Sequence, residues 1–350
     1  MAAYTTIDDP SAHFQTKIYA GTGNELVITN DGNSDLQPDF IWIKNRTDGS
    51  TNHHAVNTSV GSTRNLFVNK IDVEEGQAQS VKSIQSDGFT LGTWDGDNIN
   101  AKNFVAWQWK ANGSTTATNT TGSVDSVVQV NSDAGFSIVT FDSAGSGVFS
   151  VGHGLGVQPA MIIVKNRENT SQWRVWHKSL SNLVTSVVSL NRTDAEENYN
   201  NFWGAGVTSS LFGLQSGNSA TASNDYLAYC FAEKQGYSKF GKYVGNGNAN
   251  GTFIYTGFQP AFVMLKPSSA ADNWIIVDNK RDPSNAAEQR LFPDTDGAEG
   301  TGYDVCDMLS NGFKMGNSST SWNGSGRTYI FMAFAEHPLV TSTGIPTTAR

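Results

Sequence analysis

One phrase of ten residues occurs three times in this chain. It reads QPDFIWIKNR at 37–46, QPAMIIVKNR at 158–167 and QPAFVMLKPS at 259–268. Each copy opens with Gln-Pro and continues as an apolar run that reaches a lysine. Internal repetition constrains a fold more than composition does, because every copy has to form the same supersecondary unit. If the copies are structural, other landmarks should recur at similar distances from these lysines.

Four further landmarks do recur, and they keep one order. Eight residues beyond the three lysines, which are Lys44, Lys165 and Lys266, the chain has Asn52, Trp173 and Trp274. A phenylalanine then follows at 89, 212 and 313, and strand-like segments open at 104, 226 and 329. The segments FQTKIYAGTGN, FSIVTFDSAGS and YSKFGKYVGNG precede the three phrases. The sequence therefore predicts three tandem copies of one unit of about 100 residues, at 14–113, 135–236 and 237–339.

Each copy has the pattern of an all-β domain. Short runs rich in Val, Ile, Phe, Trp, Tyr and Thr are separated by Gly, Asn and Asp, which favour turns. About seven such runs in each copy is the strand density of an antiparallel β-sandwich, for which a jelly-roll or concanavalin-like topology is expected. FIWIK and MIIVK are apolar at consecutive positions, which predicts a central strand that is buried on both faces.

The segments outside the copies are predicted to lack cores of their own. Residues 1–13 form an N-terminal arm and residues 340–350 a C-terminal tail, each disordered or ordered by a partner. Residues 114–134 link the first two copies. The Ser/Thr/Asn/Gly-rich first half of this linker should be extended and mobile, whereas SVVQV in its second half could add an edge strand.

Charge and hydropathy disfavour several functions. The net charge of −9 and a pI of about 5.1 disfavour binding to nucleic acid, because phosphates repel an acidic surface. No run of 18 apolar residues exists, so membrane insertion is not expected. The opening residues lack the basic and apolar regions of a secretory signal peptide. Cys230 and Cys306 lie in apolar surroundings and are interpreted as buried thiols, since two cysteines form no disulfide framework.

The chain contains no recognisable catalytic motif. Nucleophile-elbow, HExxH, phosphate-loop and CxxC patterns are all missing, and the six histidines form no repeated group. The pairs Glu74–Glu75 and Glu196–Glu197 lie in polar loops, with nothing to place two acids across a cleft. We therefore predict a non-enzymatic protein without a cofactor, and keep a glycan-cleaving enzyme as an alternative because β folds often carry one.

The loops before the last strands of copies one and three contain candidate ligand contacts. TWDGDNIN at 93–100 and SWNGSGR at 321–327 each place a tryptophan among small polar residues, whereas copy two has QSGNSATASN there. An indole can stack on a sugar ring while amides and carboxylates bind its hydroxyls. The candidate glycan contacts are Trp94, Asp95, Asp97, Asn98, Trp322 and Asn323. One alternative to glycan contact is a calcium site at TWDGDNIN or at PDTDGAEG (293–300). The other is a purely structural role, in which the tryptophans close the ends of the sandwiches.

The phrases QPAMIIVKNR, AGFSIVTFDSAGSGVFSVGHGLG and FVAWQWKANGS resemble a family of virion structural, tail-fibre-like proteins from tailed bacteriophages, especially marine ones. The resemblance covers most of the chain and implies a place at the virion surface, with other virion proteins as partners. It implies no site residues.

The resulting expectation is a tail-fibre or spike component that contacts host surface glycan. The alternative is a capsid decoration or tail-assembly protein, and the chain would form a homo-oligomer, with a trimer as one form. Three like units in one chain could also imitate a trimer's threefold arrangement, a hypothesis that a linear string of copies would contradict.

Overall fold

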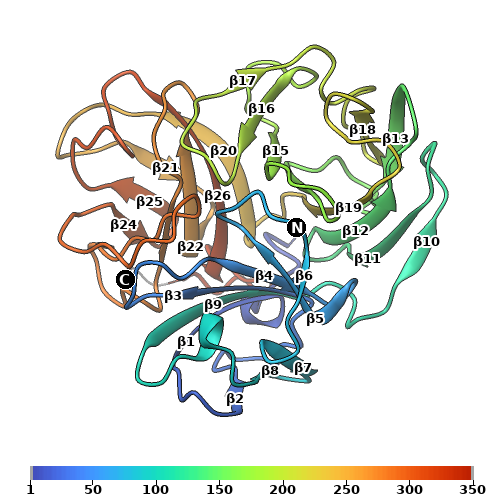
Figure 1. Cartoon of the computed structure of the whole chain (residues 1–350). Coiled ribbons are helices and arrows are strands. Elements are labelled where there is room, and N and C mark those ends of the chain that lie inside the picture. Colours follow the sequence, from blue (N-terminus) through green and yellow to red (C-terminus); the bar gives the residue numbers. More distant parts are fainter. Residues whose placement is uncertain (1–2, 348–350) are drawn as a thin grey trace.

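The computed structural model describes residues 3–347, and nearly all of its regular structure is antiparallel strand (Figure 1). The predicted all-β sandwich class is confirmed. The helices of this part of the chain are the 3₁₀ turn η1 (Pro10–Ala12) and the four-residue α1 (Asp95–Asn98). Within residues 3–347, no helix has the length and apolar character needed to cross a membrane.

We call residues 14–113, 135–236 and 237–339 units 1, 2 and 3. The strands of unit 1 are β1 (Phe14–Ala20), β2 (Leu26–Thr29), β3 (Phe40–Asn45), β4 (His54–Asn57), β5 (Gly61–Phe67), β6 (Glu75–Gly76), β7 (Val81–Gln85), β8 (Gly88–Leu91) and β9 (Asn103–Trp109). The strands of unit 2 are β12 (Phe136–Asp142), β13 (Val148–Gly152), β14 (Met161–Asn166), β15 (Arg174–His177), β16 (Ser186–Ser189), β17 (Glu197–Asn198), β18 (Leu211–Gln215) and β19 (Asp225–Phe231). Those of unit 3 are β20 (Ser238–Val244), β21 (Phe253–Tyr255), β22 (Phe258–Pro267), β23 (Ile275–Asp278), β24 (Cys306–Leu309), β25 (Gly312–Met315) and β26 (Thr328–Pro338).

One strand order recurs in the three units. The larger sheets contain the runs β1-β9-β3-β4, β12-β19-β14-β15 and β20-β26-β22-β23. In each run the first strand of the unit is followed by its last strand, then by the strand of the Gln-Pro phrase, and then by the strand after that phrase. The smaller sheets that face them are β2-β8-β7, β13-β18 and β21-β25-β24. The Gln-Pro phrases supply the interior strands β3, β14 and β22, and every residue of these strands is buried. The same order of four strands thus occurs three times along the chain.

The strand registers correct one detail of the predicted alignment. Ile43 pairs with His54, whereas Val164 pairs with Arg174 and Leu265 with Ile275. The loop after β3 is therefore one residue longer than its counterparts. As a result, His53 matches Trp173 and Trp274, and the predicted match of Asn52 with these tryptophans is wrong.

The three units share a core, and Figure 1 shows them around a common centre and not in a line. Each unit also has its own apolar cluster between its two sheets. The shared cluster gathers aromatic rings from all units. The Trp109 ring of unit 1 lies 6.2 Å from that of Phe231 in unit 2 and 5.9 Å from that of Phe262 in unit 3. The larger sheets therefore bury both faces, one inside the unit and one against the other units.

The lysines of the repeated phrase connect the units. Lys165 Nζ of unit 2 donates hydrogen bonds to the carbonyl of Ser171 in its own unit and to that of Ile71 in unit 1, both at 3.1 Å. Matching pairs of bonds run from Lys44 to Thr51 and Asp296, and from Lys266 to Asp272 and Thr193. The neighbour contacts run from unit 2 to 1, from 1 to 3 and from 3 to 2, so they close a ring. Burial lowers the pKa of each lysine to about 8.

Bidentate ion pairs reinforce two of the three junctions, whereas the junction of units 2 and 3 has the single contact of Lys239 with Glu233. Arg46 of unit 1 binds Glu299 of unit 3 through two nitrogens, and Arg167 of unit 2 binds Glu74 of unit 1 in the same way. Ser268 occupies the matching position at the third junction, where the amide of Glu196 still donates to the Ser268 carbonyl. Bidentate arginine–carboxylate pairs are stronger than single contacts, so this third junction has the weakest electrostatic support.

The segment 114–134 is more ordered than its composition predicts. SVVQV lies in β11 (Ser126–Asn131), which pairs with β12 as expected for an added strand. However, β10 (Ala117–Asn119) pairs with β11 in turn, so the expectation of a mobile first half is wrong. A strand next to an open sheet edge satisfies backbone hydrogen bonds that a free linker would leave to water.

The arm and the tail bind the chain's own body. Ile7 is buried in the shared core, and the Thr5 hydroxyl donates to the carbonyl of Gln235 in unit 2. The tail folds back on itself between Val340 and Pro346, and Ser342 binds Asp8 of the arm. The prediction that both segments are disordered or need a partner is therefore wrong for residues 3–13 and 340–347, while residues 1–2 and 348–350 lie outside the described part. Cys230 and Cys306 are buried, as predicted.

Candidate functional site

The structure encloses four of the six predicted glycan contacts. The side chains of Asp97, Asn98, Trp322 and Asn323 are buried, whereas Trp94 is half-buried and Asp95 is exposed. Buried side chains cannot contact an external sugar, so only Trp94 and Asp95 stay within reach of a ligand. The hydrogen bonds of the buried residues show what they do instead.

Asn98 ties three segments of unit 1 together. It ends α1, where its side-chain oxygen accepts the amide of Thr22 at 2.8 Å. Its amide nitrogen donates to the carbonyls of Asn24 and Gly92. An asparagine that satisfies both halves of its amide in this way is a structural clamp between loops at one end of the sandwich.

Asn323 has the same role in unit 3. Its side-chain oxygen accepts the amide of Asn246 at 3.0 Å, and its amide nitrogen donates to the carbonyls of Asn248 and Asn317. Asn98 and Asn323 are thus matching positions, and Trp322 matches Asp97 instead of Trp94. The two tryptophans therefore occupy different positions of their loops.

Aromatic side chains close this end of both units. In unit 1 the Trp94 ring covers His54, with 4.6 Å between the ring centroids. In unit 3 Trp322 is buried, and the guanidinium of Arg290 lies 5.9 Å from its ring and 4.7 Å from that of Tyr303. We call these two arrangements the aromatic plugs. They are the sandwich-closing alternative that the sequence left open.

The acidic loops do not bring three acidic side chains together among the residues that the structure describes. Asp97 Oδ2 accepts the Ser80 hydroxyl, and its Oδ1 has no partner among the described residues. Burial raises the pKa of this carboxyl to about 7, which disfavours the ionised form that a cation needs. In the loop 293–300, the Asp296 carbonyl accepts Lys44 at the junction of units 1 and 3. Across residues 3–347, no group of three His, Cys, Asp or Glu side chains could hold a metal ion.

Replacing Asp97 by asparagine is expected to stabilise the protein above neutral pH. The folded-state pKa lies near 7 and the unfolded one near 4, so the cost of ionising the buried carboxyl appears as pH rises from about 4 to 7. The free energy of unfolding of D97N should exceed that of wild type by on the order of 2 kcal/mol at pH 8 and by little at pH 4.5. Urea titrations at both pH values measure this, with D95N as the exposed control. If D97N changed the free energy of unfolding equally at pH 4.5 and pH 8, the raised pKa of Asp97 would be contradicted.

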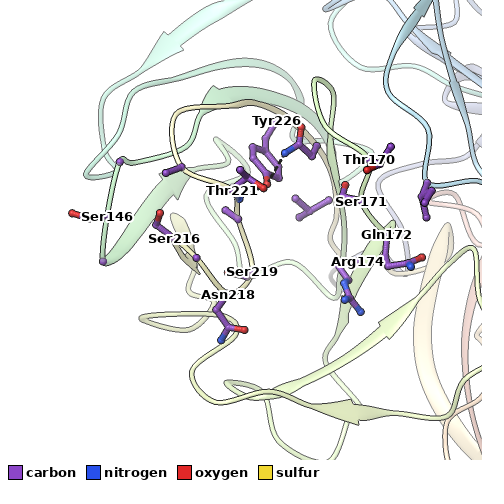
Figure 2. A pocket seen from close by; sticks show the side chains of 18 residues that line it. Ser146, Thr170, Ser171, Gln172, Arg174, Ser216, Asn218, Ser219, Thr221 and Tyr226 are labelled. Atoms are coloured by element: carbon purple, nitrogen blue, oxygen red, sulfur yellow. Dashed lines mark hydrogen bonds between the residues drawn. The ribbon is translucent and has the colours of Figure 1, made fainter.

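Unit 2 has no plug, and a pocket opens where the plugs lie in the other units (Figure 2). The segment between its last two long strands, 216–224, contains no tryptophan and is shorter than 92–102 or 316–327. The cavity measures about 730 Å³, a size typical of small-ligand sites. Its polar lining side chains are Ser146, Asn166, Thr170, Ser171, Gln172, Arg174, Ser216, Asn218, Ser219, Thr221 and Tyr226.

The wall of this pocket is fixed by a tyrosine at the start of β19. The Tyr226 hydroxyl accepts the side-chain amide of Asn166 at 2.9 Å and the backbone amide of Thr221 at 2.7 Å. These bonds hold the loop 216–222 against the larger sheet, as Figure 2 shows. Val164 and Ala220 add apolar surface, and Ile71 of unit 1 reaches the rim. The pocket therefore combines a preformed wall with many hydroxyl and amide groups.

Fold and pocket together define the class of this molecule: an all-β protein of antiparallel sandwiches with an open polar pocket in the middle unit. The chain belongs to the family described as a domain of unknown function, DUF7483, which matches residues 9–338. The match extends from the arm to the end of β26, so it covers all three units. No curated protein and no solved structure matches the chain.

Sequence reasoning placed the candidate contacts in units 1 and 3, whereas the structure has its pocket in unit 2. It sought aromatic residues in the loops, whereas the pocket lies in the unit where the loop lacks one. Two signals were present in the sequence: QSGNSATASN has no tryptophan, and Arg174 stands where the other copies have His54 and Ile275. Neither signal indicates a cavity until the plugs of the other units are seen.

Proposed function

We propose that this protein is a non-enzymatic surface protein of a tailed-bacteriophage virion, a tail-fibre or spike component that binds a host surface glycan in the unit 2 pocket. The observation that carries the proposal is the pocket itself, whose lining joins ten hydroxyl- or amide-bearing side chains to apolar surface. Sugars present ring hydroxyls that pair with such groups, and their C–H faces pack on apolar surface such as that of Val164 and Ala220. The phage assignment is supported by the resemblance of the repeated phrases.

The mutually packed units also suit a protein that works outside a cell. Three sandwiches that share one core can open only together, which protects loops and junctions from proteases. The ring needs no disulfide, in keeping with assembly in a reducing cytoplasm. A closed threefold arrangement within one chain is what the trimer-imitation hypothesis predicts, and a homo-oligomer of such rings stays part of the proposal.

Filling the pocket with an indole is expected to abolish glycan binding. The variant T221W would place a tryptophan in the pocket of unit 2, as Trp94 closes unit 1, while the backbone bond from residue 221 to Tyr226 remains. Binding to host cells and to their extracted surface polysaccharide, measured by calorimetry and by cell pull-down, should fall at least about 100-fold. The matched control is V27W, since Val27 is 62% exposed on unit 1. Undiminished binding by T221W would remove the pocket from the proposal.

A capsid decoration or tail-assembly role is the second candidate. It is favoured by the arm and the tail, which both pack on the body and leave residues 3–347 as one block instead of a shaft. Labelling the virion separates the two: label at the tail tip supports adhesion, and label on capsomers supports decoration. Incubation with host polysaccharide tests the third reading, because a glycan depolymerase would shorten the chains.

A further inference from the structure

Two differences coincide in the pocket of unit 2. The first residues of β4 and β23, His54 and Ile275, are buried, and Trp94 covers His54. The matching first residue of β15 is Arg174, and no aromatic ring covers this position from the loop 216–224. Units 1 and 3, which have plugs, thus carry His54 and Ile275 at this position, whereas unit 2, which has no plug, carries the cation Arg174. Loss of the plug alone would leave a neutral pocket, so the arginine calls for a separate explanation.

The Arg174 guanidinium is held in place from behind. Its Cζ atom lies 5.3 Å from the ring centre of Tyr199 and 5.6 Å from that of Phe202. Its Nη1 donates to the Ser189 hydroxyl at 2.9 Å and contacts Glu197 Oε2 at 3.3 Å. The hydrogen bonds of the described residues use only Nη1, so Nε and Nη2 have no partner among them, and Arg174 is one of the residues that line the pocket. Figure 2 shows the side chain at the mouth beside Gln172.

Arg174 is also the only charged residue in the pocket lining. The protein as a whole carries a net charge of −9, so a positive lining stands out against an acidic surface. Glu197 balances part of this charge from outside the pocket, but the pair is partly exposed, with 22% and 27% of the two side chains accessible. Exposed pairs contribute little, so an incoming anion can compete for the guanidinium.

We infer that the ligand is an acidic sugar, in which a carboxylate or sulfate binds Arg174 while neutral ring hydroxyls bind the hydroxyl and amide groups of the pocket. Arginine is well suited to this role because its planar fork binds both oxygens of an anion. This inference rests on the proposed glycan-binding function and names the class of glycan.

The test compares sugars that differ only in charge. Calorimetry would use uronic acid oligosaccharides and their carboxyl-reduced counterparts, and sulfated galactan oligosaccharides and their desulfated counterparts. Wild type should bind one acidic class at least about tenfold more tightly than its neutral counterpart, the ratio expected for one charge-assisted contact. Whether the carboxylate pair or the sulfate pair shows the preference identifies the anion.

Two variants assign the preference to Arg174. R174Q should bind acidic and neutral sugars alike, whereas E197Q should bind the acidic sugar more tightly because it removes the competing carboxylate. A gain of affinity in E197Q cannot come from misfolding. The control is R64Q, since Arg64 is an arginine of unit 1 outside the pocket.

The possible failures are distinguishable. Equal binding of acidic and neutral sugars by wild type, still blocked in T221W, would overturn the acidic class and leave the proposed function in place. Binding of no member of either pair would overturn both the inference and glycan binding. An acidic preference that R174Q retains would overturn the role of Arg174.

Discussion

Replacing Trp109 by alanine is expected to lower the free energy of unfolding by about 3–5 kcal/mol, as large aromatic-to-alanine changes in cores do. Trp109 is 1% exposed and lies where the three units meet. Its ring contacts Phe14 and Phe40 of its own unit and rings of units 2 and 3. The cavity would therefore weaken all three unit contacts at once. Chemical denaturation followed by circular dichroism measures the loss.

The matched control is Trp176, an equally buried residue in unit 2's own core. Both alanine variants should be destabilised, but W109A should also broaden the transition, because the units would no longer unfold as one. Hydrogen exchange in β3, β14 and β22 reports on each unit separately. If W109A and W176A gave transitions of equal sharpness, the shared core would not be the source of cooperativity.

Removing the carboxylate of Asp278 is expected to cost about 3–5 kcal/mol, because it leaves the buried Arg281 guanidinium without one of its two carboxylates and the Trp107 indole N–H without its acceptor. Asp278 Oδ2 accepts the indole N–H of Trp107 in unit 1 at 3.0 Å and Nε of Arg281 at 2.6 Å. Both side chains of the ion pair are fully enclosed, and Glu299 holds the other side of the guanidinium. The variant D278A should show the loss in urea denaturation.

A double variant separates the ion pair from the general effect of substitution. D278L/R281M removes both charges and should be less destabilised than D278A, since no charge is left buried without a partner. Breaking the exposed pair of Lys82 and Glu25 with K82Q should change stability by less than about 1 kcal/mol. If D278A were as mild as K82Q, the network would not hold unit 3 against unit 1.

The repeat made much of the fold predictable. The apolar character of FIWIK and MIIVK on both faces identified interior strands, because a half-exposed strand would alternate apolar and polar residues. SVVQV was recognised as an added strand from its β-branched residues. Its partner β10 was not, since ATN within a Ser/Thr-rich run has no strand signal of its own.

The candidate site was predictable only in part. A tryptophan among small polar residues is typical both of a sugar-stacking site and of an aromatic plug. The two differ only in whether the indole ring packs against other residues of the protein. Trp94 packs against His54, and Trp322 packs against the core of unit 3. The roles of Asn98 and Asn323 were likewise hidden, because their partners Asn24 and Asn248 are about 75 residues away in sequence.

The sequence by itself determined the all-β class and the interior place of the Gln-Pro phrase, since these follow from local apolar patterning and turn residues. The tertiary structure alone decided that the units share a core, that the buried lysines reach across a closed ring, and that one sandwich end stays open. These features depend on which distant segments meet. A missing tryptophan becomes a pocket only after the same loop, in two other units, has been seen to fill that space.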